Sequence, residues 1–356
     1  MKQIKTSKDV YGVGLFGSWS RSDASPSSDI DLFLVDASGV NHEYVERVEA
    51  GGFFVDLDYV PIEWIKGVIP PEIDQKLFEM QILYDKDWSL TNSKLLMSKI
   101  YSSPERVAIR TEGHIIESDI YLSRATSAFS RGDFRSSSLF NMVALEHILK
   151  VLLEIGLQPF SNSRFIDALR FSVEKLKRQE LFDDYIEVTG LGKVEHAQVM
   201  EKLNLFKIVW SDIDETVKRH VQTLESSHYK IKTKLKYYLS PLFFRGTVQR
   251  TTSLVDAGKS SEALHYLRSV LFDFIESYVW LKFDINKVRG NYVALIQSLE
   301  GLEKRNVKHY HNVLRVLDLN DVDKASVNDA VQKTREITLK IRRDRKVLIK
   351  NNLLKN

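Results

Sequence analysis

Cysteine is absent from the 356 residues of the chain. This absence excludes disulfide bonds and thiolate metal sites, and it favours an intracellular protein, because disulfides belong to oxidising compartments. The first residues, MKQIKTSKDV, lack the apolar core of a secretory signal peptide. No apolar run approaches the roughly 20 residues that a membrane-spanning helix needs. We therefore expect a cytoplasmic protein with no membrane partner.

Neither sign of charge dominates the chain, whose net charge is only +3, but the charges are unevenly distributed. Residues 1–90 hold 8 basic and 16 acidic residues, whereas residues 91–356 hold 43 basic and 32 acidic ones. An acidic N-terminal part suits a site that gathers divalent cations. A basic remainder suits a phosphate-bearing partner, and it suits an ordinary solvated surface equally well.

The first 90 residues alternate short β-rich runs with turn residues, which predicts an α+β domain built on a mixed sheet. Residues 40–50 have a pattern that we interpret as a short helix closed by Gly51 and Gly52. The other predicted elements are strands over residues 11–17, 29–35, 53–60 and 81–84 and a helix over residues 71–79.

Beyond residue 90, apolar residues recur at intervals of three and four, which predicts a large all-helical bundle region. Residues 124–156 align without gaps on residues 250–282. The pattern of each segment predicts a helix, a turn that contains glycine, and a second helix. The likeness suggests a duplicated hairpin, although any two amphipathic hairpins share their periodicity. The predicted helices cover residues 104–130, 134–155, 164–180, 196–224, 242–257, 261–283 and 326–349.

These patterns divide the chain into three parts. Residues 1–90 form the α+β domain, residues 91–240 form a helical domain with the first hairpin, and residues 241–356 hold the second hairpin and a basic tail. The segment 229–239 alternates Lys with other residues, and its helical surroundings favour a basic helix over a solvated strand.

The stretch FGSWSRSDASPSSDIDLFLV, residues 16–35, has the densest pattern of chemically active residues. A strand that ends at Gly17 and Ser18 presents backbone N–H groups and a hydroxyl that can hold phosphate oxygens. Asp29 and Asp31 begin the next strand and share one of its faces, because strand side chains alternate. Two neighbouring carboxylates repel each other unless a cation lies between them, so this pair is a natural Mg²⁺ site.

The strand FFVDLDYV, residues 53–60, supplies Asp56 and Asp58, which also share one face. If this strand lies beside residues 29–35, one of the two completes a cluster of three carboxylates. Such a cluster suits phosphoryl or nucleotidyl transfer with two metal ions. One ion lowers the pKa of the attacking hydroxyl, and the other stabilises the leaving pyrophosphate.

These residues resemble the signature of the DNA polymerase beta-like nucleotidyltransferase superfamily, which is Gly-Ser, a short spacer and Asp-x-Asp in a hydrophobic strand. The loop is similar, without a gap, to GSRARGTARPDSDIDL, a form common in minimal and aminoglycoside nucleotidyltransferases. Trp19 replaces a common Arg, and Ser22 replaces a common Gly. The matching positions are Gly17, Ser18, Arg21, Ala24, Pro26, Ser28, Asp29 and Asp31.

The segment VDLDYVP, residues 55–61, is similar to the family strand that carries the third carboxylate, with Asp56 in the catalytic place and Asp58 as the fallback. The resemblance implies an enzyme that moves a nucleoside monophosphate from an NTP, with ATP as the expected donor, to an acceptor hydroxyl and releases pyrophosphate. It implies that two Mg²⁺ ions are held by the catalytic residues Asp29, Asp31 and Asp56, that Gly17 and Ser18 hold the triphosphate, and that Arg21 and Ser28 are weaker nucleotide-binding candidates.

The acceptor is expected to bind in the helical region, which in two-domain relatives closes over the sheet. Glu112, Glu117 and Asp119 favour a cationic small molecule if they face the cleft. The basic segments 230–236 and 333–350 favour RNA or a nucleotide if they face it instead. The family resemblance puts a small molecule slightly ahead of RNA or a protein.

Two other classes of function stay open. An antitoxin-like nucleotidyltransferase or binding protein would act on a protein partner. A ribonuclease is the second class, because Arg305 and His311 have the spacing of the ribonuclease motif in HEPN domains, which are helical. Arg and His at this spacing arise easily by chance, so we favour a solvated helix end over a ribonuclease motif for that pair.

Overall fold

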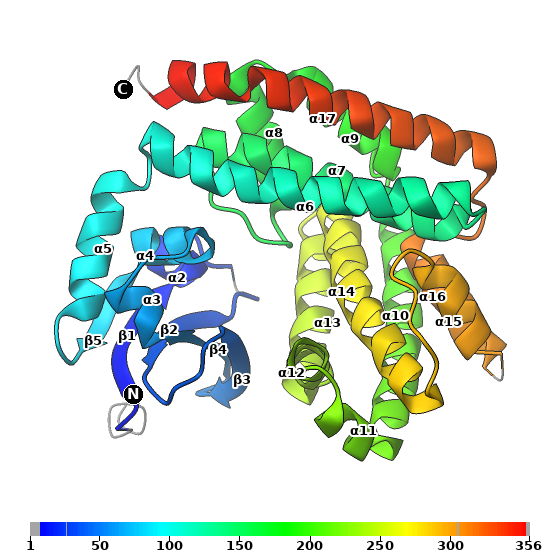
Figure 1. Cartoon of the computed structure of the whole chain (residues 1–356), viewed down its shortest axis with the longest axis horizontal. Coiled ribbons are helices and arrows are strands. Elements are labelled where there is room, and N and C mark those ends of the chain that lie inside the picture. The colour runs from blue at the N-terminus through cyan, green and yellow to red at the C-terminus, as the bar shows by residue number, and fades with distance from the viewer. Residues whose placement is uncertain (1–7, 26, 305, 354–356) are drawn as a thin grey trace. The chain divides into compact units, whose positions relative to one another are not determined.

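The computed structural model describes residues 8–25, 27–304 and 306–353 (Figure 1). Pro26 of the signature loop, Arg305 and the end of the predicted basic tail lie outside these residues. The chain divides into two compact units, the first made of Met1–Arg110 and Ser240–Arg250 and the second of Thr111–Leu239 and Thr251–Asn356. The division at residues 90 and 240 stays a prediction.

One mixed sheet of five strands forms the centre of the first unit, in the order β3-β4-β2-β1-β5. β2 and β4 run parallel, and the other neighbouring pairs are antiparallel. The predicted α+β fold, with a helical region after the sheet, is confirmed. The strands are β1 (Val10–Phe16), β2 (Ile30–Asp36), β3 (Tyr44–Ala50), β4 (Phe53–Pro61) and β5 (Gln81–Asp85).

Strand β3 replaces the helix that the sequence predicts over residues 40–50, so that prediction is wrong. Gly51 and Gly52 have φ angles of 61° and 83° and form the two-residue turn of a β-hairpin. The turn pairs β3 with β4, and Tyr44 stacks on Tyr59 with ring centroids 4.6 Å apart. Cross-strand pairing and this aromatic contact stabilise the strand. Both need partners on β4, so the pattern of residues 40–50 alone does not reveal them.

Short helices pack against one face of the sheet. Gly12 and Gly14 on β1 leave room for Leu90 and Met80, since a Cβ at Gly14 would lie 2.2 Å from the Met80 sulfur. The opposite face holds a cluster of buried aliphatic side chains that includes Val13. The helices of this part are α2 (Gly17–Arg21), α3 (Ile62–Lys66), a 3-10 turn (Pro71–Ile73), α4 (Asp74–Glu79) and α5 (Ser89–Ile100).

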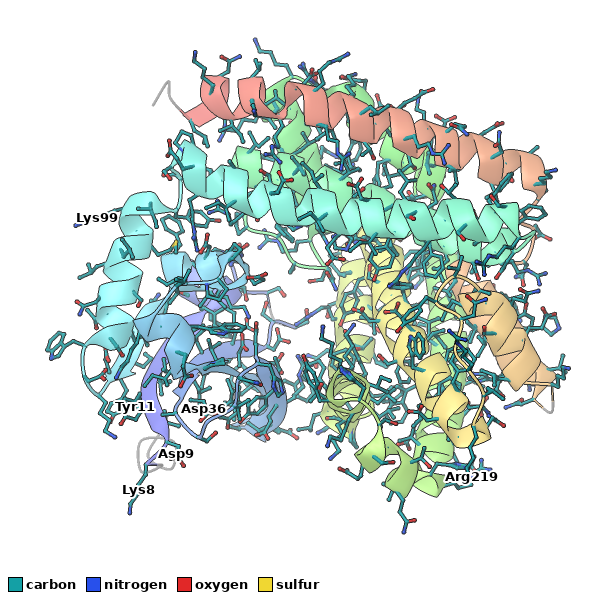
Figure 2. The ribbon with its side chains drawn as sticks, in the orientation of Figure 1. Lys8, Asp9, Tyr11, Asp36, Lys99 and Arg219 are labelled. Atoms are coloured by element: carbon teal, nitrogen blue, oxygen red, sulfur yellow. The ribbon has the colours of Figure 1, made fainter. Side chains whose placement is uncertain are left out.

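The two ends of β2 have different surroundings. Asp36 ends the strand beside the start of β1, where Tyr11 also lies (Figure 2). Asp31 stands near the other end, opposite Phe16, where β1 runs directly into α2. The residues of the Gly-Ser motif therefore meet the Asp-x-Asp motif at one end of the sheet.

The second unit is entirely helical within the residues that the structure describes. Helices α7 and α14 are buried along most of their length, and α17 lies alongside α7 (Figure 1). The predicted segment 164–180 covers α8 and only the start of α9, the segment 196–224 covers α10 and most of α11, and the segment 229–239 is helical as expected. α6 and α13 contribute residues to both units. The helices are α6 (Pro104–Ser130), α7 (Phe134–Gly156), α8 (Phe165–Leu176), α9 (Gln179–Thr189), α10 (His196–Arg219), α11 (Val221–Ser226), α12 (Tyr229–Tyr238), α13 (Pro241–Asp256), α14 (Ser260–Asn286), α15 (Leu295–Leu302), α16 (Val307–Leu317) and α17 (Lys324–Leu353).

In the part of the chain that the structure describes, none of the helices has the length and the apolar stretch needed to cross a bilayer.

Candidate active site

Three aspartates meet at the end of the sheet next to α2. Asp29 directly precedes β2, Asp31 lies within β2, and Asp56 is its register partner on the parallel strand β4. One carboxylate oxygen from each of the three lies within 4.8 Å of the others. The parallel pairing of β2 and β4 produces this cluster, because register partners on neighbouring strands point to the same face.

Two arginines bind this aspartate cluster. Arg47 on β3 donates from Nε to Asp56 Oδ1 at 2.6 Å and from Nη2 to Asp56 Oδ2 at 2.5 Å. The same Nη2 lies 2.5 Å from Asp29 Oδ2. Arg250, from the part of α13 that belongs to this unit, donates to Asp29 Oδ1 at 2.5 Å. The Arg47 side chain is only 4% exposed, so it is a buried counter-ion of two carboxylates.

The carboxylates differ in their electrostatic surroundings. Burial raises the pKa of Asp29, but the charges of Arg250 and Arg47 outweigh burial and leave this pKa below its ordinary value. Burial and the neighbouring charges of Asp29 and Asp56 raise the pKa of Asp31 well above its ordinary value. Asp31 is therefore the member of the cluster that lacks sufficient positive charge around it.

The donor set fits a divalent metal ion. Three carboxylates within reach of one another provide the hard oxygen ligands that Mg²⁺ prefers. Asp31, crowded by two like charges, would gain the counter-charge that the two arginines do not give it. An ion bound to Asp56 would, however, need oxygens that Arg47 now holds.

Gly17 allows the Gly-Ser turn to approach the aspartates. Its φ angle is +73°, and a Cβ at this position would lie 2.2 Å from Asp31 Oδ2. No other residue type fits without displacing that carboxylate. Ser18 follows in the first turn of α2, and its carbonyl oxygen accepts a hydrogen bond from the Asp23 N–H at 3.0 Å.

Glu79 at the end of α4 holds the same turn from the other side. Its carboxylate accepts hydrogen bonds from the Gly17 N–H at 2.7 Å and from Arg21 Nη1 at 2.6 Å. A carboxylate thus occupies donors that the sequence assigned to phosphate oxygens. Arg21 also lies 3.4 Å from Asp23.

Other residues of the signature loop have local roles in the structure. The Ser28 hydroxyl accepts a hydrogen bond from the Ser25 N–H at 2.9 Å. Trp19 is 38% exposed and packs edge-on against Phe53, with ring centroids 5.7 Å apart. This contact is of the kind expected of a hydrophobic anchor for the loop.

Asp58, the fallback for the third carboxylate, lies on the same face of β4 but takes part in another contact. It pairs with Lys76 of α4 at 2.5 Å, and Lys76 also binds Glu43. Burial raises the pKa of Asp58 to about 7. Asp58 therefore fixes α4 to the sheet, and it is not among the three carboxylates that cluster.

Three residues of this site are absent from the sequence-based prediction. Arg47 is absent because the sequence pattern of its segment indicates a helix. In a strand paired with residues 53–60, Arg47 lies opposite Asp56 and on the same face of the sheet. Arg250 begins the segment that aligns with residues 124–156, and no local pattern marks it as a partner of Asp29. Glu79 is the last residue of a short amphipathic helix, and nothing in the sequence around it indicates a contact with Gly17.

Residues proposed for other functions lie elsewhere. Arg305 is outside the described residues, and His311 lies exposed on α16. Glu112 binds Arg345 at 2.5 Å and Asp119 binds Arg342, so these two acidic residues of α6 are paired with α17.

Residues 1–94 match the family model of the nucleotidyltransferase domain. No curated protein matches the chain. Among solved structures, the chain is similar to a nucleotidyltransferase-like protein from Exiguobacterium sibiricum 255-15, with 11% sequence identity over 86% of this chain and 88% of that chain. The TM-score of 0.32 is too low to establish a common fold over that length. The match over residues 1–94 includes the strands that carry all three aspartates, so this part of the chain is similar to a nucleotidyltransferase domain.

Proposed function

We propose that the protein transfers a nucleoside monophosphate from an NTP, with ATP as the donor, to a hydroxyl group of a small acceptor molecule. The observation that carries this proposal is the cluster of Asp29, Asp31 and Asp56 beside the Gly17 turn. The acceptor oxygen bonds to the α-phosphorus, the bond from that phosphorus to its bridging oxygen breaks, and pyrophosphate leaves. The hydroxyl proton passes to Asp56.

The residues of the domain divide this task. Asp29, Asp31 and Asp56 hold Mg²⁺, which when bound neutralises charge on the phosphates and lowers the pKa of the acceptor hydroxyl. Gly17 and Ser18 bind the triphosphate through N–H and O–H donors, and Arg21 and Ser28 support them. Two Mg²⁺ ions per active site follow from the resemblance to the family.

Arg47 gives this proposal a specific condition. Because its guanidinium binds both oxygens of Asp56 and one of Asp29, it competes with a metal ion for the same ligands. We propose that Arg47 leaves these oxygens when Mg²⁺ and the nucleotide bind, and that its charge then faces the triphosphate. A guanidinium suits that role because it presents several donors to phosphate oxygens.

Pairing within the helical unit supports a small acceptor over RNA. In the basic tail, Lys333 binds Asp184 at 2.8 Å and Lys340 binds Glu180 at 2.7 Å. On α12, Lys236 binds Glu225 at 2.6 Å. Positive charges with acidic partners attract a polyanion weakly, since counter-ion release needs unneutralised cations.

A labelling experiment tests the proposal. The protein is incubated with Mg²⁺, a panel of hydroxylated acceptors and ATP that carries the label on either the α- or the γ-phosphate. We expect the α-label to move to an acceptor and the γ-label to appear in pyrophosphate. A γ-label on the acceptor would mean phosphoryl transfer and would overturn the proposal, as would the absence of pyrophosphate with every acceptor.

A further inference from the structure

The helical unit contains a cavity of about 260 Å³ between helices α7 and α14, which we call the α7–α14 cavity. Every residue that lines it belongs to the helical unit. Its volume suits a single small molecule, since sites for drug-sized ligands begin at roughly 300 Å³. Among the described residues, none of those that line the cavity comes from the first unit.

The two helices present aligned positions to the cavity. When residues 124–156 are aligned on 250–282, each α14 residue that lines the cavity falls on an α7 residue that also lines it. The aligned pairs are Leu139 and His265, Met142 and Arg268, Val143 and Ser269, Glu146 and Phe272, and His147 and Asp273. The cavity thus lies between corresponding faces of two similar hairpins, yet polar residues stand where a helical bundle normally has apolar ones.

Glu146 and His265 meet in the cavity without a hydrogen bond between them. Glu146 Oε2 lies 3.9 Å from His265 Nε2, and this buried nitrogen has no hydrogen-bond partner among the described residues. Tyr185 Oη lies 3.0 Å from His265 Nδ1, and burial keeps the Tyr185 hydroxyl protonated by raising its pKa. When Tyr185 donates to Nδ1, Nε2 carries the imidazole proton and points it at Glu146.

The gap between Glu146 and His265 suits a hydroxyl group. A hydroxyl between them donates to the carboxylate and accepts from the imidazole N–H, and so gives the buried His265 Nε2 a hydrogen-bond partner. His265 is held in position by Phe165, whose ring stacks on it with centroids 4.9 Å apart. The receiving groups are therefore already oriented.

The charges in the cavity are paired by the protein itself. Lys150 binds Glu146 at 2.8 Å, and Arg268 pairs with Asp318 and donates to the Thr189 carbonyl at 2.9 Å. Asp273 accepts a hydrogen bond from Tyr238 at 3.0 Å and pairs with Lys234. An added phosphate would approach Glu146 and Asp273, so an uncharged ligand is favoured.

Aromatic rings form another wall of the cavity. Tyr121 stacks on His147 with centroids 5.7 Å apart and contacts the Phe272 ring edge-on. A flat apolar surface beside paired hydrogen-bonding groups suits a ring that has C–H groups on its faces and hydroxyls at its edge. We propose that the α7–α14 cavity binds a small uncharged molecule with a hydroxylated sugar ring, and that one ring hydroxyl bridges Glu146 and His265.

Binding measurements on the full chain without Mg²⁺ test this inference independently of transfer activity. Isothermal titration calorimetry measures the binding of adenosine and of glucose. These ligands represent the two sources of a sugar ring, a nucleoside and a free sugar. AMP tests the exclusion of charge. Glu146→Gln removes the charged acceptor, and Ser269→Leu fills the cavity without breaking an ion pair. Glu180→Gln, an exposed change on α9, is the control.

We expect saturable binding of adenosine, glucose or both, weakened about tenfold or more by Glu146→Gln and by Ser269→Leu. The control variant should bind as the unchanged protein does, and AMP should bind at least about tenfold more weakly than adenosine. Thermal melts of each variant establish that it is folded, and Ser269→Leu serves if Glu146→Gln does not fold. Binding of adenosine alone identifies a nucleoside, and binding of glucose alone a free sugar.

Three results would overturn the inference. One is the absence of binding for both adenosine and glucose at millimolar concentration. Another is tighter binding of AMP than of adenosine. The third is binding that both cavity variants leave unchanged, which would place the ligand elsewhere. Failure of this test leaves the proposed transfer reaction unaffected, because that reaction depends on residues of the other unit.

Discussion

Arg47 and Asp56 are register partners on strands β3 and β4, and the guanidinium of Arg47 binds both oxygens of the Asp56 carboxylate, at 2.6 and 2.5 Å. The same guanidinium contacts Asp29 at 2.5 Å. A cation fixed to the protein thus stands at two of the three carboxylates proposed to hold Mg²⁺. Metal binding and this ion pair are therefore linked.

Replacement of Arg47 by Ala tests this linkage. Without the guanidinium, the buried carboxylates repel one another, so the free energy of unfolding should fall by about 3 kcal/mol in the absence of metal. Mg²⁺ should restore part of that loss, and the midpoint of thermal unfolding should rise more with Mg²⁺ than it does in the unchanged protein. Arg245→Ala, which removes an exposed pair with Glu49 and a contact with the Phe54 ring but no contact with the aspartates, is the control. Equal responses to Mg²⁺ in both variants would contradict the competition.

Gly17 should not tolerate a side chain. Gly17→Ala places a methyl group against Asp31 Oδ2 and keeps an unfavourable φ of +73°. Gly39→Ala is a matched control, because Gly39 has a φ of +89° and no atom within 4 Å of the added Cβ. We expect both variants to lose about 1 kcal/mol of stability from the backbone conformation, and Gly17→Ala alone to lose transferase activity. Equal activities in the two variants would refute a role for this close approach.

Glu79 should act through the Gly-Ser turn. Glu79→Gln keeps an oxygen that can accept from the Gly17 N–H but removes the charge that holds Arg21. We expect the KM for ATP to rise severalfold while kcat changes less, because the turn is misplaced and the aspartates remain. Steady-state kinetics measure the two constants. A fall in kcat at constant KM would mean that Glu79 acts in the chemical step instead.

Acid should destabilise the helical unit through His265. Burial lowers the pKa of His265 to about 4 from an ordinary value of 6.5, although the charge of Glu146 opposes this shift. The unfolded chain therefore binds more protons between these two values, and stability falls as the pH decreases from 6.5 towards 4, by at most about 3 kcal/mol. Thermal melts across this range should show a shallower decline for His265→Gln. Identical slopes would mean that His265 is not the group responsible.

The sequence predicted the first unit well where a strand carries its own pattern. Residues 29–35 and 53–60 were expected as strands and form β2 and β4 within one residue at each end. The sequence does not predict that these two strands pair, because the register between distant strands depends on contacts that no local pattern encodes. The three-carboxylate cluster was expected only if they do. The parallel pairing of Asp31 with Asp56 met that condition.

The remaining features depend on contacts between distant segments. Gly51 and Gly52 suit either the end of a helix or a hairpin turn, and only pairing with β4 selects the turn. Arg250 lies far along the chain from Asp29, so their contact could not be inferred from spacing. The sequence-based prediction also lacks α15 and α16, although Tyr310, Val313, Leu314 and Leu317 of α16 recur at intervals of three and four.

Pyrophosphate release from ATP by Asp31→Asn is the most direct test of the account. Asn keeps the size of the side chain but removes the charge proposed to bind Mg²⁺. Asp36→Asn, the same change at the other end of β2, is the control (Figure 2). The assay contains Mg²⁺ and an acceptor that the unchanged protein modifies. We predict that Asp31→Asn releases pyrophosphate at least about a thousandfold more slowly than the unchanged protein. The unfolding temperature of this variant should not fall. Release by Asp31→Asn at the rate of the unchanged protein would contradict the assignment of the aspartate cluster as the catalytic centre.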